Sequence, residues 1–328
     1  NDYGSLHYPE PTKFELWLVH ATSSDQAKQL QQKLIAVEEW ADSLNINLQT
    51  RLLSEESLSQ QHPSSEDLNR FYLNGLVLAG SSPLWWAISP EQEESNYDQT
   101  AKSLTQQRLF GYSSIIDFGP LHKANAQQLL TNTSQLLLTA IEQGLEPLLD
   151  LLHYQHQLNT FANISWPSKQ LKKAVYQGEK DPLFLDNNVL KLAALMNATA
   201  LSEQHQLLAQ QSLYIAFNEH LSKLVSQPQY PWRRAVIKQL VSSWQWPQHH
   251  IQILDQRQDS TYRQFQSEHQ LVGELHLIIR DTMVGFAKKH AIDLRKENQQ
   301  LDQKYQLFHD IAPNIIPYLP NAFLPQKN

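Results

Sequence analysis

The sequence predicts an α+β protein, with a small sheet and its helices near the N-terminus and a large, mainly α-helical region after it. Three observations lead to this prediction. Short segments near the N-terminus alternate apolar and polar side chains and are rich in β-forming residues. Further along the chain, apolar residues recur at helical spacing, and prolines separate the predicted helices. Only 9 of the 328 residues are glycine, which favours long helices over a glycine-rich phosphate-binding fold.

The N-terminal part begins with a strand–helix–strand pattern. Alternating, β-forming residues predict a strand over residues 14–19. Apolar residues at helical spacing predict a helix over residues 24–44, with Ser24 or Asp25 as its N-cap. Alternation returns over residues 46–52, which predicts a second strand. The three elements together indicate a small sheet covered by helices.

A connecting segment is expected before the next helix. Residues 55–65 are polar and end in the run Gln-Gln-His-Pro-Ser-Ser, so we predict a loop there. Ser64, with Asp67 three residues on, predicts the start of a helix that runs to Gly80. The apolar piece between two prolines, residues 83–90, is too short to assign by periodicity.

The remainder of the chain is predicted to form helices joined by polar connectors. A long Leu-rich segment, residues 124–158, is expected to be helical with an interruption at Gly144 or Pro147. Further helices are predicted at residues 187–199, 202–226, 233–246, 261–289 and 294–310.

Composition and charge narrow the class of protein. The chain has 26 Lys and Arg against 33 Asp and Glu, a net charge of −7, so it lacks the basic surface of a nucleic-acid-binding protein. It contains no Cys, which excludes disulfides, thiolate metal ligands and Cys nucleophiles and indicates a cytoplasmic location. No apolar run approaches the roughly 18–20 residues that a membrane span needs. Because the sequence begins with Asn1 rather than Met, we expect a fragment or a processed product.

The first candidate site lies at the N-terminus. A Gly4-Ser5 pair precedes the predicted strand, on which Lys13, Glu15 and Trp17 share one face because residues two apart point the same way. In nucleotidyl-transfer enzymes that face carries two carboxylates that bind magnesium, and a Gly-Ser turn contacts the phosphates. From the residues alone, the simpler interpretation is that Lys13 and Glu15 are a solvated pair at a strand edge.

A longer pattern links the chain to a known family. Residues 232–246, Trp-Arg-Arg through Trp-Gln-Trp, followed by residues 253–257, resemble a block of the class I (enterobacterial-type) adenylate cyclases, and so do residues 286–290. The similarity covers essentially the whole chain, and the Trp-Arg-Arg block is its most specific part. Further matches in the same order are Glu38–Leu44, Arg70–Tyr72, Leu78–Gly80, Leu84–Trp85, Pro90, Glu93–Glu94, Tyr97–Asp98 and Asp117–Leu121.

The resemblance implies a fold and a nominal reaction. Residues 1–100 would form a partial nucleotidyltransferase-type domain with a small mixed sheet, and residues 101–328 a helical domain. The nominal reaction is ATP to cyclic AMP plus diphosphate, with Mg²⁺ as the cofactor and ATP as the ligand. By this resemblance, Gly4 and Ser5 would contact the nucleotide, and Glu15 would be the surviving catalytic carboxylate and metal ligand. Lys13, which is not a family residue, would contact a phosphate directly and favour nucleotide binding without turnover. An unidentified protein regulator is a further partner that the family allows.

The chain departs from the family at its metal-binding positions. Lys13 and Glu15 stand where the family has two aspartates, and on the next strand Ser54 stands where it has an acid. Two magnesium ions need several anionic oxygens at short range. An ammonium group repels them instead, by roughly 4 kcal/mol per pair of unit charges at about 4 Å and an effective dielectric constant of about 20. We therefore predict a degenerate member with lost or strongly weakened catalysis; the alternative is a non-catalytic regulatory or protein-interaction module on the cyclase scaffold.

One further block of residues has both a functional and a structural interpretation. Trp232, Arg233 and Arg234 could bind a nucleotide or a regulator through stacking and guanidinium forks. Helical spacing favours the other interpretation, a buried stripe that contains Trp232 and Trp244, with both arginines solvated. Arg280 is expected to lie on the polar face of a long helix.

Histidines form two close pairs in the sequence. His153 and His156 are three residues apart, and His249 and His250 are adjacent. A zinc site needs three or four ligands, and neither pair has a further ligand at motif spacing. We therefore expect these histidines to have structural or surface roles.

Overall fold

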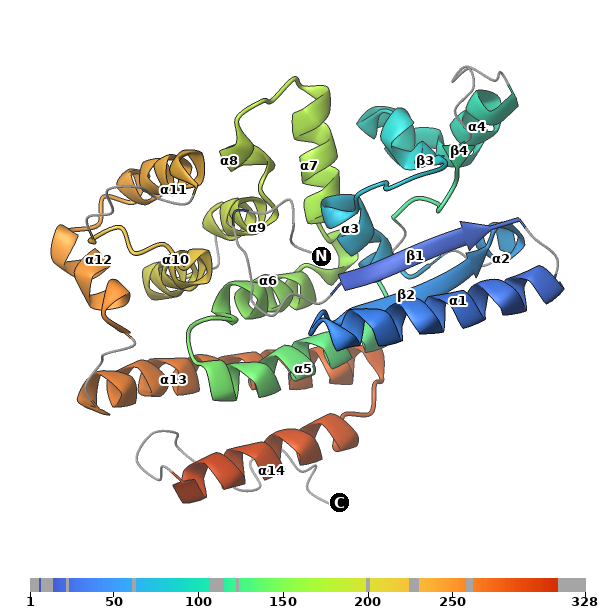
Figure 1. The fold of residues 1–328 in the computed structure, drawn as a ribbon. Coiled ribbons are helices and arrows are strands. Elements are labelled where there is room, and N and C mark those ends of the chain that lie inside the picture. The colour runs from blue at the N-terminus through green and yellow to red at the C-terminus, as the bar shows by residue number, and fades with distance from the viewer. Residues whose placement is uncertain are drawn as a thin grey trace. The chain divides into compact units, whose positions relative to one another are not determined.

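The structure, a computed structural model, describes most of the chain (Figure 1). At residues 24, 59–60, 142, 262–271 and 307–311 the description covers the backbone and not the side chains. The described residues are 6, 14–21, 24–60, 63–106, 115–121, 124–198, 201–223, 230–257 and 262–311.

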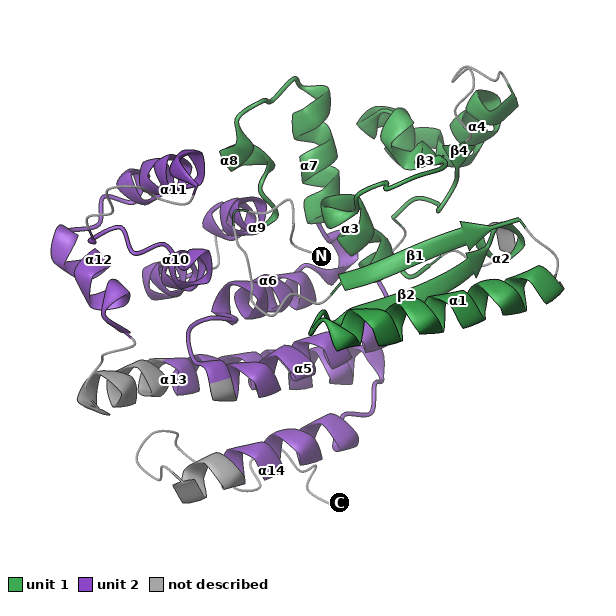
Figure 2. Cartoon of the chain, viewed as in Figure 1, with its two compact units in different colours: residues 1–123, 166–187 green, residues 124–165, 188–328 purple. Residues whose placement is uncertain are grey.

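The chain divides into two compact units (Figure 2). Unit 1 comprises residues 1–123 and 166–187, and unit 2 comprises residues 124–165 and 188–328. Unit 1 thus includes some residues beyond 100, and the domain border predicted at that residue stays a prediction. None of the helices in the described ranges is long and apolar enough to cross a membrane.

Unit 1 begins with the predicted strand–helix–strand arrangement. Strand β1 (Phe14–His20) pairs in parallel with β2 (Leu48–Ser54), and α1 (Ser24–Ser43) connects them and packs on β2 (Figure 1). A parallel pair requires such a crossover, because a short turn cannot return the chain to the same end of the sheet. Both predicted strands and the helix between them are therefore confirmed.

A short helix occupies part of the segment predicted to be a loop. Helix α2 (Glu55–Gln60) follows directly on β2, so the prediction of a loop over residues 55–65 is wrong in its first half. The Oγ of Ser54 accepts the backbone N–H of Ser57 at 2.9 Å. This hydrogen bond satisfies one of the free donors of the first helical turn, as an N-cap does. Ser54 is thus a helix-start signal directly before the segment predicted to be a loop.

The next helix starts where the sequence predicts it and ends earlier. Helix α3 (Ser65–Asn74) is capped by Ser64, whose Oγ accepts the N–H of Asp67 at 3.1 Å. The helix ends before Gly75, which has an extended backbone conformation. The predicted end at Gly80 is therefore wrong. A Cβ added to Gly75 would lie 2.4 Å from the carbonyl oxygen of Phe71, so only glycine allows this close approach.

The rest of unit 1 consists of helices and a second two-stranded sheet. Helix α7 follows α5 and α6 of unit 2 in the sequence, but it packs against α3 and α4. It therefore belongs to unit 1. Both sheets among the described residues are parallel and two-stranded, and the predicted mixed sheet is not among them. The remaining elements of unit 1 are β3 (Ser82–Pro83), η1 (Leu84–Ala87), α4 (Pro90–Gln106), β4 (Ile115–Ile116), α7 (Pro167–Tyr176) and α8 (Pro182–Leu185).

Unit 2 is built from helices around α5 and α6. Helix α5 (Ala126–Gln143) ends at Gly144, whose φ of 66° favours glycine, and α6 (Leu148–Asn159) follows, so the predicted interruption is confirmed. Helix α6 packs against α5, α10 and α13, and α5 also packs against α13 and α14. The other elements are η2 (Phe161–Asn163), α9 (Asn187–Met196), α10 (Glu203–Phe217), α11 (Pro231–Ser243), α12 (Gln248–Asp255), α13 (Tyr262–His290) and α14 (Arg295–Ile311).

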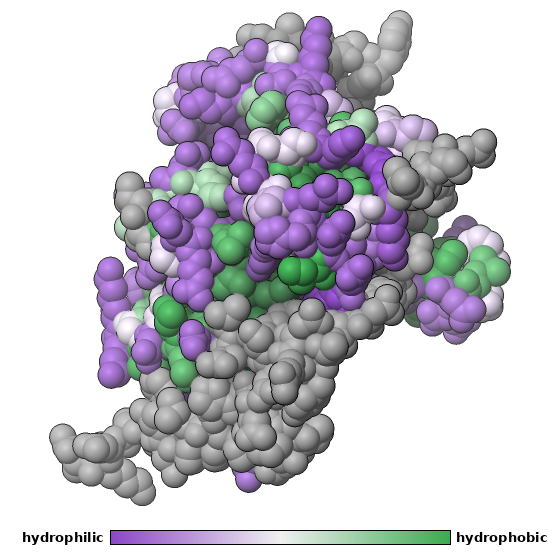
Figure 3. All heavy atoms as spheres, turned by 90° about the vertical axis from the view of Figure 1, so that its left-hand side faces the viewer, coloured by the Kyte–Doolittle hydropathy of each residue, from purple (hydrophilic) through white to green (hydrophobic). Residues whose placement is uncertain are grey.

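The mainly helical α+β class is thus confirmed, with leucine-rich cores in both units. Fully buried side chains in unit 1 include Leu68, Leu84 and Trp85. Figure 3 views the side that carries α11 and α12 and shows polar residues over most of the coloured surface, with small groups of apolar residues between them. Single exposed apolar residues are normal on a protein surface. The fully buried side chains of unit 2 include Leu129, Leu130, Leu137, Ile141, Leu148 and Leu151.

Candidate functional site

The strand face around Glu15 is the first candidate site. Glu15 lies on β1, opposite Gln49 of β2, and Trp17 lies opposite Arg51. The indole Nε1 of Trp17 donates a hydrogen bond to Oε1 of Glu15 at 2.8 Å. Glu15 and Trp17 therefore point to the same side of the strand, as their spacing predicts.

Two arginines share the carboxylate of Glu15. Nη2 of Arg51 lies 3.4 Å from Oε1 of Glu15, and Nη2 of Arg70 lies 3.9 Å from Oε2 of the same residue. Both arginines also contact Asp67, Arg70 at 2.7 Å and Arg51 at 3.5 Å. Strand β1, strand β2 and helix α3 thus each supply charged groups to one cluster. We call Glu15, Arg51, Asp67 and Arg70 the Glu15 quartet.

Aromatic rings support the quartet from one side. The rings of Trp17 and Phe71 stack at 5.0 Å with an interplanar angle of 6°. Phe118 contacts both rings, at 4.9 Å from Phe71 and 6.0 Å from Trp17. The guanidinium of Arg51 lies over the Trp17 ring at 5.1 Å, which is within the range of a cation–π interaction. This packing limits the rotamers available to Trp17 and Arg51.

The residues of the quartet do not fit a magnesium pair. Each carboxylate oxygen of Glu15 faces a guanidinium group, where a metal site would present free anionic oxygens. In the described part of the chain, no group of three or more His, Cys, Asp or Glu side chains could hold a metal ion. Gly4, Ser5 and Lys13 lie outside the described residues, so their expected convergence with Glu15 stays a prediction.

A second cluster of polar groups is buried in unit 1. Nζ of Lys172, on α7, lies 2.7 Å from Oε2 of Glu93, on α4, and both side chains are almost completely buried. The ammonium group also lies 4.0 Å from the centre of the Trp85 ring, on which the ring of Tyr72 stacks at 4.1 Å. Burial lowers the pKa of Lys172, while the hydrogen bond and the charge of Glu93 oppose that shift.

Asp117 joins this cluster to the loop after β4. The hydroxyl of Tyr97 donates to Oδ1 of Asp117 at 2.6 Å, and the N–H of Gly119 donates to the same oxygen at 2.8 Å. The hydroxyl of Tyr72 donates to the carbonyl oxygen of Gly119 at 2.8 Å. Burial raises the pKa of Tyr72 and of Tyr97, and the nearby Asp117 adds to both shifts. Both hydroxyls therefore remain protonated donors.

Most residues of this buried cluster belong to the segments that resemble the cyclase family. Tyr72, Trp85, Glu93, Tyr97 and Asp117 all occur among those matches. Their ion pair, ring stacking and hydrogen bonds are made with one another, with Lys172 and with the neighbouring backbone. This arrangement favours a structural role in the core of unit 1. Lys172 has no recognisable signal in the sequence, because no local pattern connects it to a glutamate 79 residues earlier.

The Trp-Arg-Arg block of α11 is oriented opposite to the prediction. Trp232 is 56% exposed, whereas Arg233 is buried at 7% exposure, so the interpretation of a buried Trp232 with solvated arginines is wrong. Arg233 donates to the carbonyl oxygen of Phe217 at 2.5 Å and to Glu219 at 3.0 Å. Helix α10 ends at Phe217, and the last carbonyls of a helix lack partners within it and carry partial negative charge. These carbonyl oxygens need hydrogen-bond donors, and the guanidinium of Arg233 supplies more of them than the indole ring of Trp232 could.

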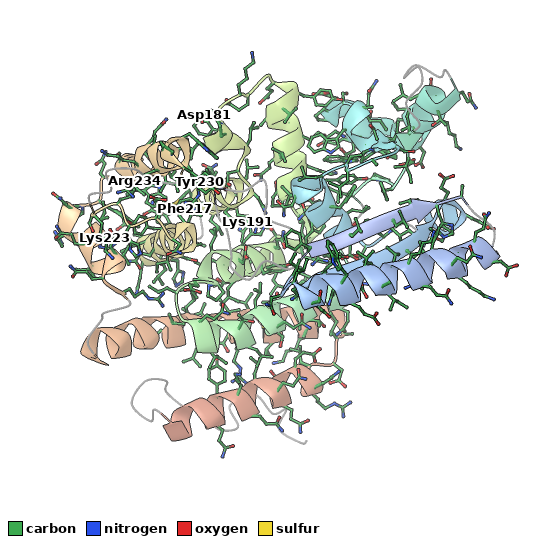
Figure 4. The ribbon with its side chains drawn as sticks, in the orientation of Figure 1. Asp181, Lys191, Phe217, Lys223, Tyr230 and Arg234 are labelled. Carbon is green, nitrogen blue, oxygen red and sulfur yellow. The ribbon has the colours of Figure 1, made fainter. Side chains whose placement is uncertain are left out.

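Arg234 binds the same connection from its other side. It lies 2.6 Å from the carboxylate of Glu219 and donates to the carbonyl oxygens of His220 and Lys223 at 3.1 and 2.8 Å. Figure 4 labels Arg234 with Phe217, Lys223 and Tyr230, which lie on neighbouring segments of unit 2. The two arginines are therefore engaged in holding the segment after α10, which favours a structural role for the block.

Replacing Arg233 with methionine is expected to lower the free energy of unfolding by about 1.5–3 kcal/mol, because a charged hydrogen-bond donor to a helix end is lost. Replacing the neighbouring Trp232 with alanine is expected to cost less than about 1 kcal/mol, because the side chain is largely exposed. Urea denaturation of both variants measures the difference. A larger loss for Trp232→Ala than for Arg233→Met would contradict this assignment.

Arg280 and His153 are also buried in unit 2. Arg280 is 5% exposed, pairs with Asp302 at 2.8 Å and lies over the ring of Tyr305 at 5.4 Å, so its expected place on a polar helix face is wrong. The pairing with α14 explains its burial, because a guanidinium is buried when it has a carboxylate partner. His153 is 4% exposed, and its Nε2 lies 3.1 Å from Nε2 of Gln157, which agrees with a structural role.

Fold and site together define a class of protein: a small parallel α+β unit with a charged strand face, joined in one chain to a helical unit. The family model described as the second domain of class-I adenylate cyclases matches residues 124–312, which are more than half of the chain. The chain therefore belongs to the class I adenylate cyclase family. The resemblance inferred from the sequence is confirmed.

Curated relatives are similar to most of this chain. The adenylate cyclase of Proteus mirabilis is 23% identical over 305 residues, which are 88% of this chain and 35% of that protein. The adenylate cyclases of Yersinia intermedia and Escherichia coli K12 are 23% and 24% identical over 303 residues, with the same coverage. The chain is thus a divergent member and spans about a third of the length of these relatives. No solved structure matches it.

Proposed function

We propose that this chain is the degenerate counterpart of a class I adenylate cyclase, in which the conversion of ATP to cyclic AMP and diphosphate is lost or strongly weakened. Family membership supports the nominal reaction and ATP as the nominal ligand. The ion pairs of Glu15 support the loss of catalysis. In this proposal unit 1 derives from a nucleotidyltransferase-type domain, and the protein acts in the cytoplasm.

The observation that supports the loss of catalysis most directly is the position of Glu15 between Arg51 and Arg70. A metal ion bound to this carboxylate would lie close to two guanidinium charges and would compete with the indole N–H of Trp17 for Oε1. At about 4 Å, each like-charge pair with a divalent ion costs several kcal/mol at an effective dielectric constant of about 20. By family resemblance the reaction needs Mg²⁺, and this strand face opposes its binding.

A cyclase assay tests the proposal directly. The purified chain, supplied with ATP and Mg²⁺, is expected to form no cyclic AMP that depends on Glu15, so wild type and Glu15→Ala should give the same yield by mass spectrometry. The exposed Glu56→Ala serves as a matched control for removal of a carboxylate elsewhere in unit 1. Cyclic AMP formed at a rate that Glu15→Ala abolishes and Glu56→Ala preserves would overturn the proposal.

The second candidate is a non-catalytic regulatory or protein-interaction module on the same scaffold. The arginine-bound state of Glu15 favours it as well, because a module needs no metal site. Thermal unfolding with millimolar ATP separates the two, since a ligand stabilises only the state that binds it. Stabilisation that requires Mg²⁺ supports the first candidate, a weakened cyclase that still binds ATP with its metal. No stabilisation by ATP, with or without Mg²⁺, supports the module.

A further inference from the structure

In the Glu15 quartet the arginines lie nearer to solvent than the carboxylates. The side chains of Arg70 and Arg51 are 65% and 41% exposed. Those of Glu15 and Asp67 are only 27% and 20% exposed. The formal charges of the four groups cancel, but a solvent molecule or ion that approaches the cluster meets guanidinium groups first. The positive side of the cluster is therefore its outer side.

The arginines keep unused hydrogen-bond donors. Among the described residues, Arg70 contacts both carboxylates only through Nη2, so its Nε and Nη1 face no acceptor there. The contacts of Arg51 with Glu15 and Asp67 are 3.4 and 3.5 Å long, at the limit of a hydrogen bond. A guanidinium has five N–H donors, and most of those on this pair remain available for a further acceptor.

The chemistry of these donors favours a phosphate group. Planar guanidinium groups match the geometry of phosphate oxygens and bind them through paired, charge-assisted hydrogen bonds. The ring of Trp17 beneath Arg51 restricts that side chain before any ligand binds, which reduces the entropy lost on binding. The half-buried carboxylates of Glu15 and Asp67 weaken the attraction without removing it, so the affinity should be moderate and should fall with added salt.

We propose that Arg51 and Arg70 bind the phosphate group of a small phosphorylated molecule directly, without a metal ion. The inference rests on the proposed function in one respect, because it uses the strand face that would hold metal ions in an active cyclase. In this proposal, the guanidinium groups of Arg51 and Arg70 take the place of magnesium as the cations that bind phosphate on that face. Lys13, Gly4 and Ser5 have no part in it.

Calorimetric titration of the full chain in EDTA tests the proposal. ATP and inorganic diphosphate are expected to bind, and adenosine, which has no phosphate, is not. Arg70→Gln and Arg51→Gln should each weaken the binding of diphosphate about tenfold, which corresponds to about 1.4 kcal/mol. Arg295→Gln is the matched control, because Arg295 is an exposed arginine paired with Asp293 at 2.6 Å in unit 2. It should leave the affinity unchanged.

A gain of affinity distinguishes a phosphate site from a purely structural ion-pair cluster. Asp67→Asn removes one competing charge and frees Nη2 of Arg70, so diphosphate should bind several-fold more tightly. The backbone N–H of Asp67, which Ser64 caps, is kept in this variant. Melting temperatures without ligand show whether each variant folds.

Three results would overturn the inference: no binding of ATP or diphosphate in EDTA, binding only with Mg²⁺, or equal affinities in wild type and both arginine variants. This failure differs from that of the proposed function. Formation of Glu15-dependent cyclic AMP overturns the proposed function whatever the titration in EDTA shows. The titration in EDTA decides the phosphate site on its own.

Discussion

Replacing Lys172 with methionine is expected to lower the free energy of unfolding by about 3–5 kcal/mol, because it leaves the carboxylate of Glu93 buried without its nearest cation. Lys172 is completely buried and forms a 2.7 Å ion pair with Glu93. Lys169, 3.6 Å from the other carboxylate oxygen, gives partial compensation and places the expected loss near the lower end. Chemical denaturation of wild type and variant measures the difference.

The chain offers a matched control for this substitution. Lys191 pairs with Asp150 at the same distance of 2.7 Å, but the side chain of Asp150 is 41% exposed. Lys191→Met should therefore cost about 1 kcal/mol or less. The double variant Lys172→Met with Glu93→Leu should recover much of the stability, because apolar groups of similar size can replace a buried ion pair. Equal losses for Lys172→Met and Lys191→Met would refute the assignment.

Acid is expected to destabilise unit 2 through His153. Burial lowers the pKa of this histidine to about 3; the charge of Lys191 adds to the shift, Asp150 opposes it and His156 adds slightly. An unfolded histidine titrates near pH 6.5, so between these pH values the unfolded chain binds a proton that the folded chain does not. The free energy of unfolding should therefore fall by about 1.4 kcal/mol for each pH unit as the pH decreases from about 6.5.

Substitution of His153 isolates this contribution. His153→Gln removes the titrating group, so the stability of the variant should depend less steeply on pH between about 6 and 4 than that of wild type. The exposed His249→Gln serves as the control for loss of a histidine and should keep the steeper dependence. Denaturation curves at several pH values give the slopes. Parallel pH profiles for wild type and His153→Gln would show that His153 is not the cause.

Local signals predicted much of the fold. The sequence predicts Ser64 as a helix cap and a break between α5 and α6 at Gly144 or Pro147, because caps, glycines with positive φ and prolines act within a few residues. The helix after Ser54 was missed, although its cap is equally local, because the following polar run suggested a loop. The end of α3 was placed too late, because the approach of Gly75 to Phe71 is not visible in periodicity.

The candidate site was predicted only in part. The sequence predicts that Glu15 and Trp17 share a face, and the hydrogen bond between their side chains agrees with this. It gives no sign that Arg51 and Arg70 reach that face, because they come from another strand and from a helix after it. The same reason explains Arg233, whose burial depends on the end of a different helix.

The amino-acid sequence by itself determined the family of this protein and the type of most helices and strands, since these are properties of residue order and local spacing. Only the tertiary structure decided which charges meet. Glu15 meets arginines, and Lys172 meets a glutamate 79 residues away. Such pairs form where packing brings distant segments together and burial makes an unpaired charge costly.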